Sequence, residues 1–244
     1  MFKTMFAMFL IFHVLGDFYA QPEKLAAGKR EKYGYVLLHG GIYTIVFFAA
    51  ACLTWLFRAV WFAAALSLAH FLIDSLKHIM RKSVEKRGKG DIFLYLADQL
   101  LHLASFAAAA AAAVYIKFPA QDLFLAGFFR DILSLEPGIA VRWAGILLLI
   151  CKPANITVKR ILAPYKPREQ TGVFKNAGAL IGSLERILIV ILVGAGQFAA
   201  IGFVLTAKSV ARYEKLKEQD FAEYYLLGTL LSTLNAIAVY YLFI

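Results

Sequence analysis

Four long apolar runs, separated by short polar segments, fill the first half of the chain. They are continuous rather than alternating in hydrophobicity, which favours membrane-spanning helices over strands. Each run has the roughly 20 residues that a helix needs to cross the hydrocarbon core of a membrane. We therefore expect four transmembrane helices, over Phe2–Tyr19, Gly34–Phe57, Ala59–Met80 and Ile92–Ile116.

The pattern is less regular after residue 117. Charged residues interrupt the apolar stretch Gln121–Leu135, which is typical of an amphipathic helix that lies in the membrane interface. The run Gly138–Cys151 is apolar but short, and Pro153 breaks it. It predicts either a half-helix or re-entrant segment, or a kinked span if residues 154–162 extend it.

Two further apolar runs, Leu184–Thr206 and Phe221–Ile244, predict the last spans. A helical hairpin starting near Val173 is an alternative that would keep the later basic loops on one side of the membrane. The expected fold is all-α, a polytopic helical membrane protein with six or seven transmembrane helices plus an interfacial or re-entrant segment. We divide it into a four-helix half, residues 1–117, and a C-terminal half, residues 118–244.

The composition agrees with this class of protein. Hydrophobic residues make up 61% and charged residues 17% of the 244 positions, which excludes an ordinary soluble domain. The net charge of +10 would suit a nucleic-acid partner. However, Lys and Arg concentrate in the loops between apolar runs, as the positive-inside rule predicts. We therefore expect the lipid bilayer as a partner and no nucleic acid.

The basic loops also predict the orientation, because such loops remain in the cytoplasm. The loop Gln21–Tyr33 carries four basic residues and the loop after Met80 carries five, while Arg58 alone marks the turn between the second and third runs. The predicted topology is multi-pass in a bacterial inner membrane, with the N-terminus outside.

All five histidines lie before residue 103. Three of them pair with an aspartate four residues away, so each pair shares one face of a helix. The pairs are His13/Asp17, His70/Asp74 and Asp98/His102, and His39 stands alone in the second run. Successive spans run in opposite directions, which places all of these residues near the cytoplasmic ends of their helices. We expect them to converge at one depth.

Imidazole and carboxylate groups from facing helices are typical ligands of zinc, manganese and iron. We expect a divalent metal ion, zinc in the first place, with manganese or iron as alternatives. The candidate ligands are His13, Asp17, His39, His70, Asp74, Asp98 and His102. Candidate catalytic acids or bases are Asp17, Asp74 and Asp98. Residues expected to contact these ligands or a substrate are Gln21, Tyr43, Lys77, His78 and Gln99.

A second, smaller polar cluster lies in the C-terminal half. Its members are Glu185, Arg186, Lys208 and Arg212. Charge pairing between helix ends is one interpretation. The other is a basic pocket for the phosphate of a lipid or another anion, because Lys and Arg at a membrane boundary suit that role.

Four stretches carry the histidines and aspartates of the first half, namely His13-Val-Leu-Gly-Asp17-Phe-Tyr-Ala-Gln21, Leu38-His39, His70-Phe-Leu-Ile-Asp74-Ser-Leu-Lys77 and Asp98-Gln99-Leu-Leu-His102. Together they resemble a bacterial integral-membrane family catalogued as domain of unknown function 3307. The stretches Ile181–Arg186 and Ala207–Arg212 look like the longer members of that family. The resemblance implies a membrane protein but no activity. More loosely, the His/Asp pairs resemble the membrane-bound metal-dependent hydrolases of bacterial inner membranes.

The sequence thus predicts a metal-dependent hydrolase with its site near the cytoplasmic leaflet, and a lipid or lipid-linked phosphate as substrate. Two alternatives stay open. One is a transporter or channel for a divalent ion or protons, which would need polar residues in both halves of the membrane. The other is a non-catalytic membrane scaffold, in which the His/Asp pairs only hydrogen-bond between helices. An anionic lipid and a second copy of the chain are candidate partners.

Overall fold

The described part of the chain consists of helices and the turns between them. The computed structural model describes residues 1–86, 91–119, 130, 134, 136–167 and 177–244. In these ranges six helical stretches are long and apolar enough to cross a membrane. They cover Phe2–Tyr19, Tyr33–Trp55, Phe57–Arg81, Ile92–Tyr115, Pro137–Tyr165 and Gln219–Phe243. The predicted all-α, polytopic membrane class is confirmed.

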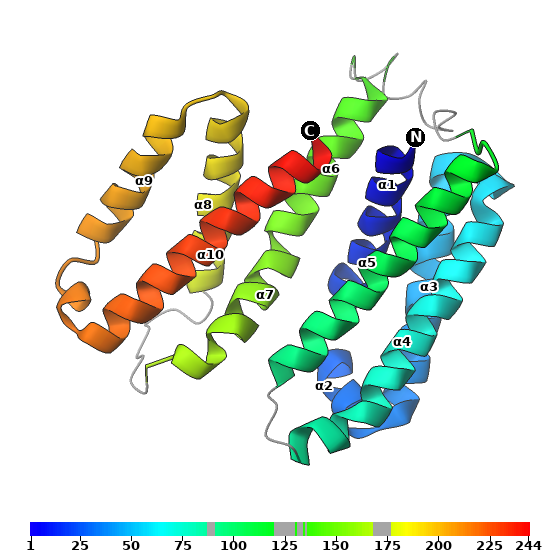
Figure 1. The fold of residues 1–244 in the computed structure, drawn as a ribbon, viewed down its shortest axis with the longest axis horizontal. Helices are drawn as coiled ribbons and strands as arrows, with labels where there is room; N and C mark the ends of the chain where they lie inside the picture. The colour runs from blue at the N-terminus through cyan, green and yellow to red at the C-terminus, as the bar shows by residue number, and fades with distance from the viewer. Residues whose placement is uncertain (87–90, 120–129, 131–133, 135, 168–176) are drawn as a thin grey trace. The chain divides into compact units, whose positions relative to one another are not determined.

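Helices α1 to α5 belong to the first of two compact units, Met1–Gly145 (Figure 1). Their bounds are α1 Phe2–Val14, α2 Glu23–Glu31, α3 Tyr33–Trp55, α4 Val60–Lys86 and α5 Asp91–Tyr115. Helix α1 packs against α3 and α5, and α4 packs against the same two helices. The four long helices therefore close a ring, and residues on their inner faces meet at its centre.

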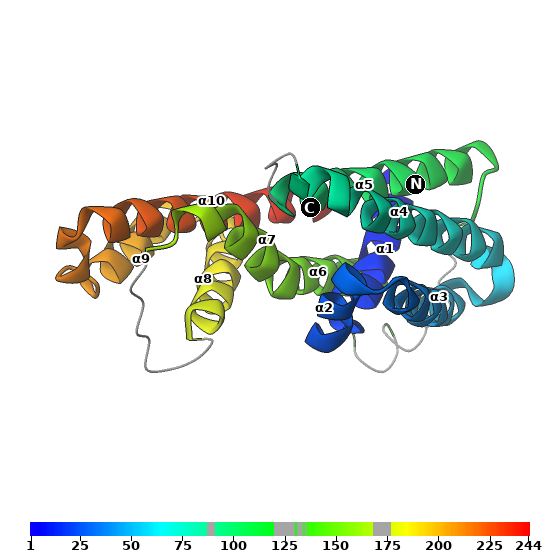
Figure 2. The same cartoon turned by 90° about the horizontal axis from the view of Figure 1, so that it is seen from below.

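Two local features shape one end of this bundle. Helix α1 continues as a π-helical turn, Leu15–Tyr19, before the chain leaves the membrane span. The predicted polar loop Gln21–Tyr33 is wrong in detail, because it contains the short helix α2, which lies beside the end of α3 (Figure 2). The helix begins directly after Pro22, and its Leu25 is buried. Proline at a helix start and one apolar anchor are enough to order a short amphipathic helix.

The second unit comprises Ile146–Ile244. Helix α6, Pro137–Ile150, contributes residues to both units. The helices that lie wholly in the second unit are α7 Lys152–Leu162, α8 Ala177–Gly194, α9 Phe198–Val210 and α10 Gln219–Phe243. Of the alternatives for residues 138–162, the structure has the kinked span, since α6 and α7 follow each other with a break at Cys151. Helix α10 packs against α7 and α8.

The predicted single span Leu184–Thr206 is wrong. Helix α8 ends at Gly194 and α9 begins at Phe198, and the two form a hairpin (Figure 1). Gly196 in the turn has a φ of +69°, a left-handed conformation that glycine adopts without steric cost. A hairpin near Val173 was one of two arrangements that the basic loops left open, the other being a re-entrant segment around Lys152, and the described part of the hairpin starts at Ala177. The predicted interfacial helix Gln121–Leu135 lies, apart from positions 130 and 134, outside the described residues.

Candidate metal centre

Each of the four long helices of the first unit contributes one histidine to a single polar centre. His13 lies on α1, His39 on α3, His70 on α4 and His102 on α5, and all four have a relative exposure of 1% or less. The ring centroids of His70 and His102 are 4.6 Å apart, and those of His13 and His102 are 4.7 Å apart. The histidines therefore converge as the helix pattern predicts.

Three aspartates complete this centre, which we call the His/Asp cluster. Its potential ligand atoms form three groups, and within each group all of them lie within 4.8 Å of one another. The groups are Asp17/His39/His70/Asp74, His13/His70/His102 and Asp74/Asp98/His102. Because His70, Asp74 and His102 each belong to two groups, the three groups are overlapping positions in one continuous site.

The closest ligand atoms surround His39. Its Nε2 lies 3.1 Å from Asp17 Oδ1 and 3.1 Å from His70 Nε2. Asp74 Oδ2 lies 3.6 Å from His39 Nε2 and 3.7 Å from His70 Nε2. Two ligands of one tetrahedral zinc ion, each at about 2.0–2.1 Å from it, are roughly 3.3 Å apart. The separations in this group therefore fit a shared divalent ion.

Several buried atoms of the cluster have no hydrogen-bond partner among the described residues. They are His13 Nε2, His39 Nδ1, His70 Nδ1, Asp98 Oδ1 and both ring nitrogens of His102. Buried polar atoms are nearly always satisfied in native proteins, and leaving one unpaired costs about 1–3 kcal/mol. His102 Nε2 and Asp98 Oδ1 are 3.6 Å apart, too far for a hydrogen bond but close enough to bind one ion together.

Two lysines extend their ammonium groups into the cluster. Lys29 Nζ, from α2, lies 2.8 Å from Asp74 Oδ2 and 3.8 Å from Asp17 Oδ1. Lys77 Nζ, from α4, lies 2.7 Å from Asp98 Oδ2. The two lysine side chains are 16% and 18% exposed, whereas those of the three aspartates are 3–12% exposed. The lysines therefore reach the carboxylates from the more accessible side.

Lys77 was expected near the ligands from its place in the sequence, but Lys29 was not. The basic residues of the first loop indicated only the orientation of the chain. Lys29 reaches the cluster because a long side chain on a short helix beside a bundle can extend inward. Pro22 was the sequence signal that a helix begins there.

Tyr43 holds two of the histidines in place, as its predicted position near the ligands suggested. The Tyr43 hydroxyl is 3.2 Å from His13 Nδ1, and its ring stacks on the imidazole of His70 at 3.6 Å. Gly16 makes this packing possible, because a Cβ at that position would lie 2.7 Å from Tyr43 Cδ2. No sequence pattern indicates the role of Gly16, since only the fold brings it against Tyr43.

The remaining predicted neighbours differ in their roles. Gln99 Nε2 donates to Asp98 Oδ2 at 3.1 Å. The Gln21 amide, oriented with its nitrogen toward Asp17, donates to Asp17 Oδ1 at 3.3 Å. His78 Nδ1 instead donates to the backbone carbonyl of Lys29 at 2.9 Å. His78 thus anchors α2 and is in none of the ligand groups.

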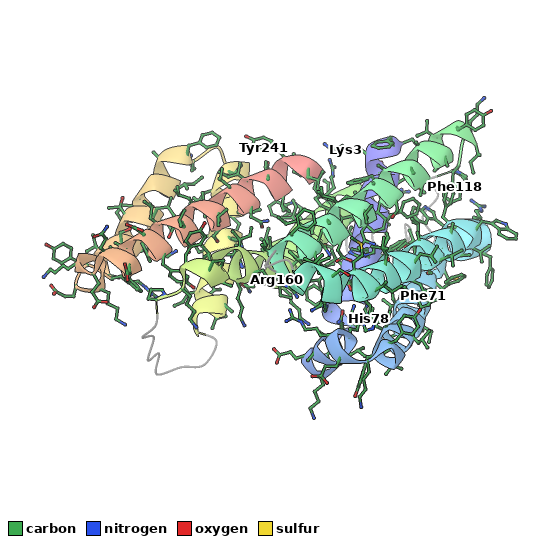
Figure 3. All side chains as sticks on the ribbon, turned by 60° about the horizontal axis from the view of Figure 1, so that its bottom comes forward. Lys3, Phe71, His78, Phe118, Arg160 and Tyr241 are labelled. Carbon is green, nitrogen blue, oxygen red and sulfur yellow. The ribbon has the colours of Figure 1, made fainter. Side chains whose placement is uncertain are left out.

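Aromatic side chains fill the bundle on the other side of the histidines. They are Phe9, Phe12, Phe47, Trp55, Phe62 and Phe118, whose contacting rings have centroids 5.4–6.4 Å apart. Figure 3 shows His78 beside α2 and Phe118 toward the opposite end of the bundle. Among the described residues, the charged partners of the cluster therefore lie on the α2 side and the aromatic packing on the other.

The predicted C-terminal residues lie in the second unit, where Arg186 is 2% exposed. Its Nε donates to the carbonyl of Ile150, the last residue before the break between α6 and α7. Its Nη1 donates to Ser232 Oγ at 3.0 Å and its Nη2 to Asn155 Oδ1 at 2.6 Å. Arg186 therefore donates to a backbone carbonyl at a helix end inside an apolar unit. Backbone groups in hydrocarbon surroundings need such a partner within the protein.

The other members of this second cluster pair with each other or with an aromatic ring. Lys208 Nζ is 2.6 Å from Glu185 Oε2, and it also donates to Thr229 Oγ1 at 3.2 Å. The guanidinium carbon of Arg212 lies 6.0 Å from the centroid of the Tyr225 ring. The geometry thus favours charge pairing over a preformed phosphate pocket.

Comparison with known proteins reaches the first half of the chain. Residues 5–125 match the model of one protein family, which is described as "Protein of unknown function (DUF3307)". The match contains the whole His/Asp cluster, whereas the stretches Ile181–Arg186 and Ala207–Arg212 lie outside it. No curated protein and no solved structure matches the chain.

Proposed function

Because residues 5–125 belong to the DUF3307 family, whose function is unknown, we propose a function from the site itself: a metal-dependent hydrolase within the membrane. One observation carries this proposal. Four helices bring seven buried or half-buried histidines and aspartates into groups whose ligand atoms lie within 4.8 Å of one another, and several side-chain nitrogen and oxygen atoms of these residues have no hydrogen-bond partner among the described residues. Such a cluster is costly in a membrane protein unless it has a use.

The donor set suits zinc best. The group Asp17/His39/His70/Asp74 offers two imidazole nitrogens and two carboxylate oxygens, and three of these donors with a water in the fourth position would complete a tetrahedral zinc site. Manganese or iron would suit the carboxylate-rich group Asp74/Asp98/His102 equally well. When bound, such an ion lowers the pKa of a bound water and so supplies a nucleophile at neutral pH.

Asp98 is the group we assign as general base. Its Oδ1 is buried and has no hydrogen-bond partner among the described residues, so it can accept a proton from a water beside the cluster. Its Oδ2 accepts from Lys77 and Gln99, which fix the direction of the carboxylate. Asp17 and Asp74, which lie in the densest group, are ligands in this assignment.

The alternative functions receive less support from the geometry. A channel or transporter needs a polar path through both halves of the bundle, and aromatic rings from Phe9 to Phe118 pack across the half away from α2. A scaffold needs its buried polar groups to satisfy one another, yet both ring nitrogens of His102 have no hydrogen-bond partner among the described residues. An enzyme with a site that opens on one side agrees with both observations.

We propose that this side faces the cytoplasm and that a lipid or lipid-linked phosphate is the substrate. Lysines at the α2 end would attract anionic headgroups. Labelling of single cysteines at the exposed positions Lys24 and Ser83 with a membrane-impermeant reagent tests the orientation. Both should react only from the cytoplasmic side, and reaction from opposite sides would contradict the convergence of the helix ends.

Metal analysis of the purified protein tests the function. Protein prepared without chelators should contain about one divalent ion per chain. His70→Ala removes a residue shared by two ligand groups, so the affinity should fall at least roughly 100-fold, more than the loss of an outer partner of a ligand causes. His78→Ala, on the same helix, is the matched control and should keep the ion. Absence of the ion from the native protein would refute the proposal.

If the ion is present, reconstitution separates the alternatives. The protein in vesicles should hydrolyse a phosphate ester of a lipid, and this turnover should stop in the Asp98→Asn variant. Flux of the ion across the vesicle membrane without any turnover would favour the transporter instead.

A further inference from the structure

The ammonium groups of the two lysines lie next to carboxylate oxygens of the His/Asp cluster, where a bound metal ion would also lie. Lys29 Nζ lies within 3.8 Å of two of the four ligand residues in the densest group, Asp17 and Asp74. Lys77 Nζ lies 2.7 Å from the carboxylate of Asp98, in the neighbouring group. An ammonium group neutralises a buried carboxylate in the same way as a metal ion does, but with half the charge.

Metal ion and ammonium compete for the same oxygens. A zinc ion would lie about 2.0–2.2 Å from a carboxylate oxygen that it binds. Lys29 Nζ is already 2.8 Å from Asp74 Oδ2, so both cations would lie against one oxygen. Like charges at such a distance repel strongly in a buried site. An ion bound in the densest group would therefore displace the ammonium group of Lys29, whereas that of Lys77 would remain against Asp98.

The charge of the loaded site indicates what the displaced Lys29 can bind. The ion pairs of the cluster join three aspartates to two lysines, which leaves one negative charge with neutral histidines. A divalent ion changes this to one positive charge. A singly charged anion would restore neutrality, and a phosphodiester carries that charge at neutral pH.

The position of α2 allows this exchange with little movement of the backbone. His78 Nδ1 donates to the carbonyl of Lys29, which holds that part of the helix against α4. The Lys29 side chain is 16% exposed, so its ammonium group can turn toward the accessible side while α2 stays in place. There it would meet an anion that approaches the cluster from the same side.

We propose that Lys29 occupies the carboxylates of Asp17 and Asp74 when the ion is absent and, once it binds, turns to hold a phosphodiester group next to it, beside Lys77. This inference rests on the proposed metal site and names the anion that the site recognises. Lys29 would contact the phosphodiester directly and would compete with the metal ion for the carboxylates. Removing Lys29 must therefore strengthen metal binding and weaken anion binding, two changes of opposite sign.

The test compares Lys29→Met with Lys24→Met in the full-length protein in detergent micelles. Lys24 is exposed on the same helix, so its variant controls for the loss of one positive charge on α2. Zinc affinity is measured by competition with a chromogenic chelator, and anion binding with dimethyl phosphate added to the zinc-loaded protein. Lys29→Met should lower the Kd for zinc roughly tenfold and raise the Kd for dimethyl phosphate by a similar factor, because one partly buried ion pair is lost in each case. Lys24→Met should change neither.

Nanodiscs distinguish a lipid headgroup from a free phosphodiester. Zinc-loaded protein in phosphatidylglycerol discs should bind dimethyl phosphate more weakly than in discs of an uncharged glycolipid without phosphate if the headgroup occupies the same site. Equal binding in both would assign the site to a free phosphodiester. Lys29→Gln serves as a second variant if Lys29→Met is poorly folded.

Two failures are distinguishable. If neither the wild type nor any variant binds zinc, the proposed metal site is wrong. If the wild type binds zinc but Lys29→Met binds it with equal or lower affinity, the metal site stands and the role of the lysines is overturned. Zinc-loaded protein that binds no dimethyl phosphate in any membrane mimic also overturns it.

Discussion

Arg186 offers a direct way to separate a structural role from an anion-binding role in the second unit. Its three donor nitrogens reach the Ile150 carbonyl, Asn155 and Ser232, and the side chain is 2% exposed. If these bonds are its purpose, Arg186→Met should destabilise the fold. If Arg186 instead serves to bind an anion, the same change should spare stability and weaken lipid binding.

The magnitude follows from the acceptors that the change leaves behind. Ser232 and Ser183, whose Oγ lies 3.4 Å from Arg186 Nη2, have hydroxyls that can rotate toward other groups. The Ile150 carbonyl and Asn155 Oδ1 instead lose a donor that they cannot easily replace. Each buried acceptor without a partner costs about 1–3 kcal/mol. Methionine fills a similar volume and needs no solvation of a charge, which offsets part of the loss. We expect the free energy of unfolding to fall by about 2–4 kcal/mol.

Thermal or SDS-induced unfolding in detergent measures this change. A loss of that size lowers the midpoint of thermal unfolding by roughly 5–15 °C for a chain of this length. Arg186→Lys keeps the charge but loses the planar fork of donors, so it should lie between the wild type and Arg186→Met. Arg142→Met is the control, because Arg142 is exposed and donates within its own helix to Gly138. Equal midpoints for Arg186→Met and the wild type would refute the structural role.

Two further predictions concern the His/Asp cluster. Gly16→Ala should lower the free energy of unfolding by about 1–3 kcal/mol, because the new Cβ would lie 2.7 Å from Tyr43. Gly41→Ala is the control and should not lower it, because a Cβ at that position meets no atom within 4 Å. Thermal unfolding of both variants in detergent measures this change. If the contact with Tyr43 were irrelevant, Gly16→Ala would not lower the midpoint of unfolding. Tyr43→Phe removes the hydrogen bond to His13 but keeps the stacked ring, so zinc affinity should fall about tenfold while the midpoint of unfolding changes little. An unchanged affinity in the chelator competition would show that Tyr43 does not orient the ligand.

The membrane spans were predictable where hydrophobicity alone decides them. The first four runs agree with α1, α3, α4 and α5 because a helix in hydrocarbon satisfies its own backbone and needs only length and apolar side chains. Hydrophobicity alone did not predict the hairpin of α8 and α9, because the turn residues Gly194-Ala195-Gly196 do not interrupt the apolar run. The signal was conformational rather than polar, because two glycines around one alanine favour a turn.

The convergence of the histidines was also predictable, because it depends on two periodicities. Residues four apart share a helix face, and consecutive spans reverse direction, so His70 and Asp98 had to approach the same end of the bundle. Lys29 and Gly16 could not be found in this way. Their roles depend on distances between helices, 2.8 Å from Lys29 to Asp74 and 2.7 Å from a Cβ on Gly16 to Tyr43, which no single helix encodes.

The charge of the His/Asp cluster limits how many ions it can hold. Its three ligand groups share His70, Asp74 and His102, so filling two groups at once would place two divalent ions against common ligands. With both lysines in place, two ions would bring the local charge to three positive units, compared with one for a single ion. Excess charge of that kind is strongly unfavourable in a buried site unless several anions accompany it. A single ion that can bind at any of three overlapping positions needs one monoanion to reach neutrality, which is the condition that a phosphodiester bound between Lys29 and Lys77 fulfils.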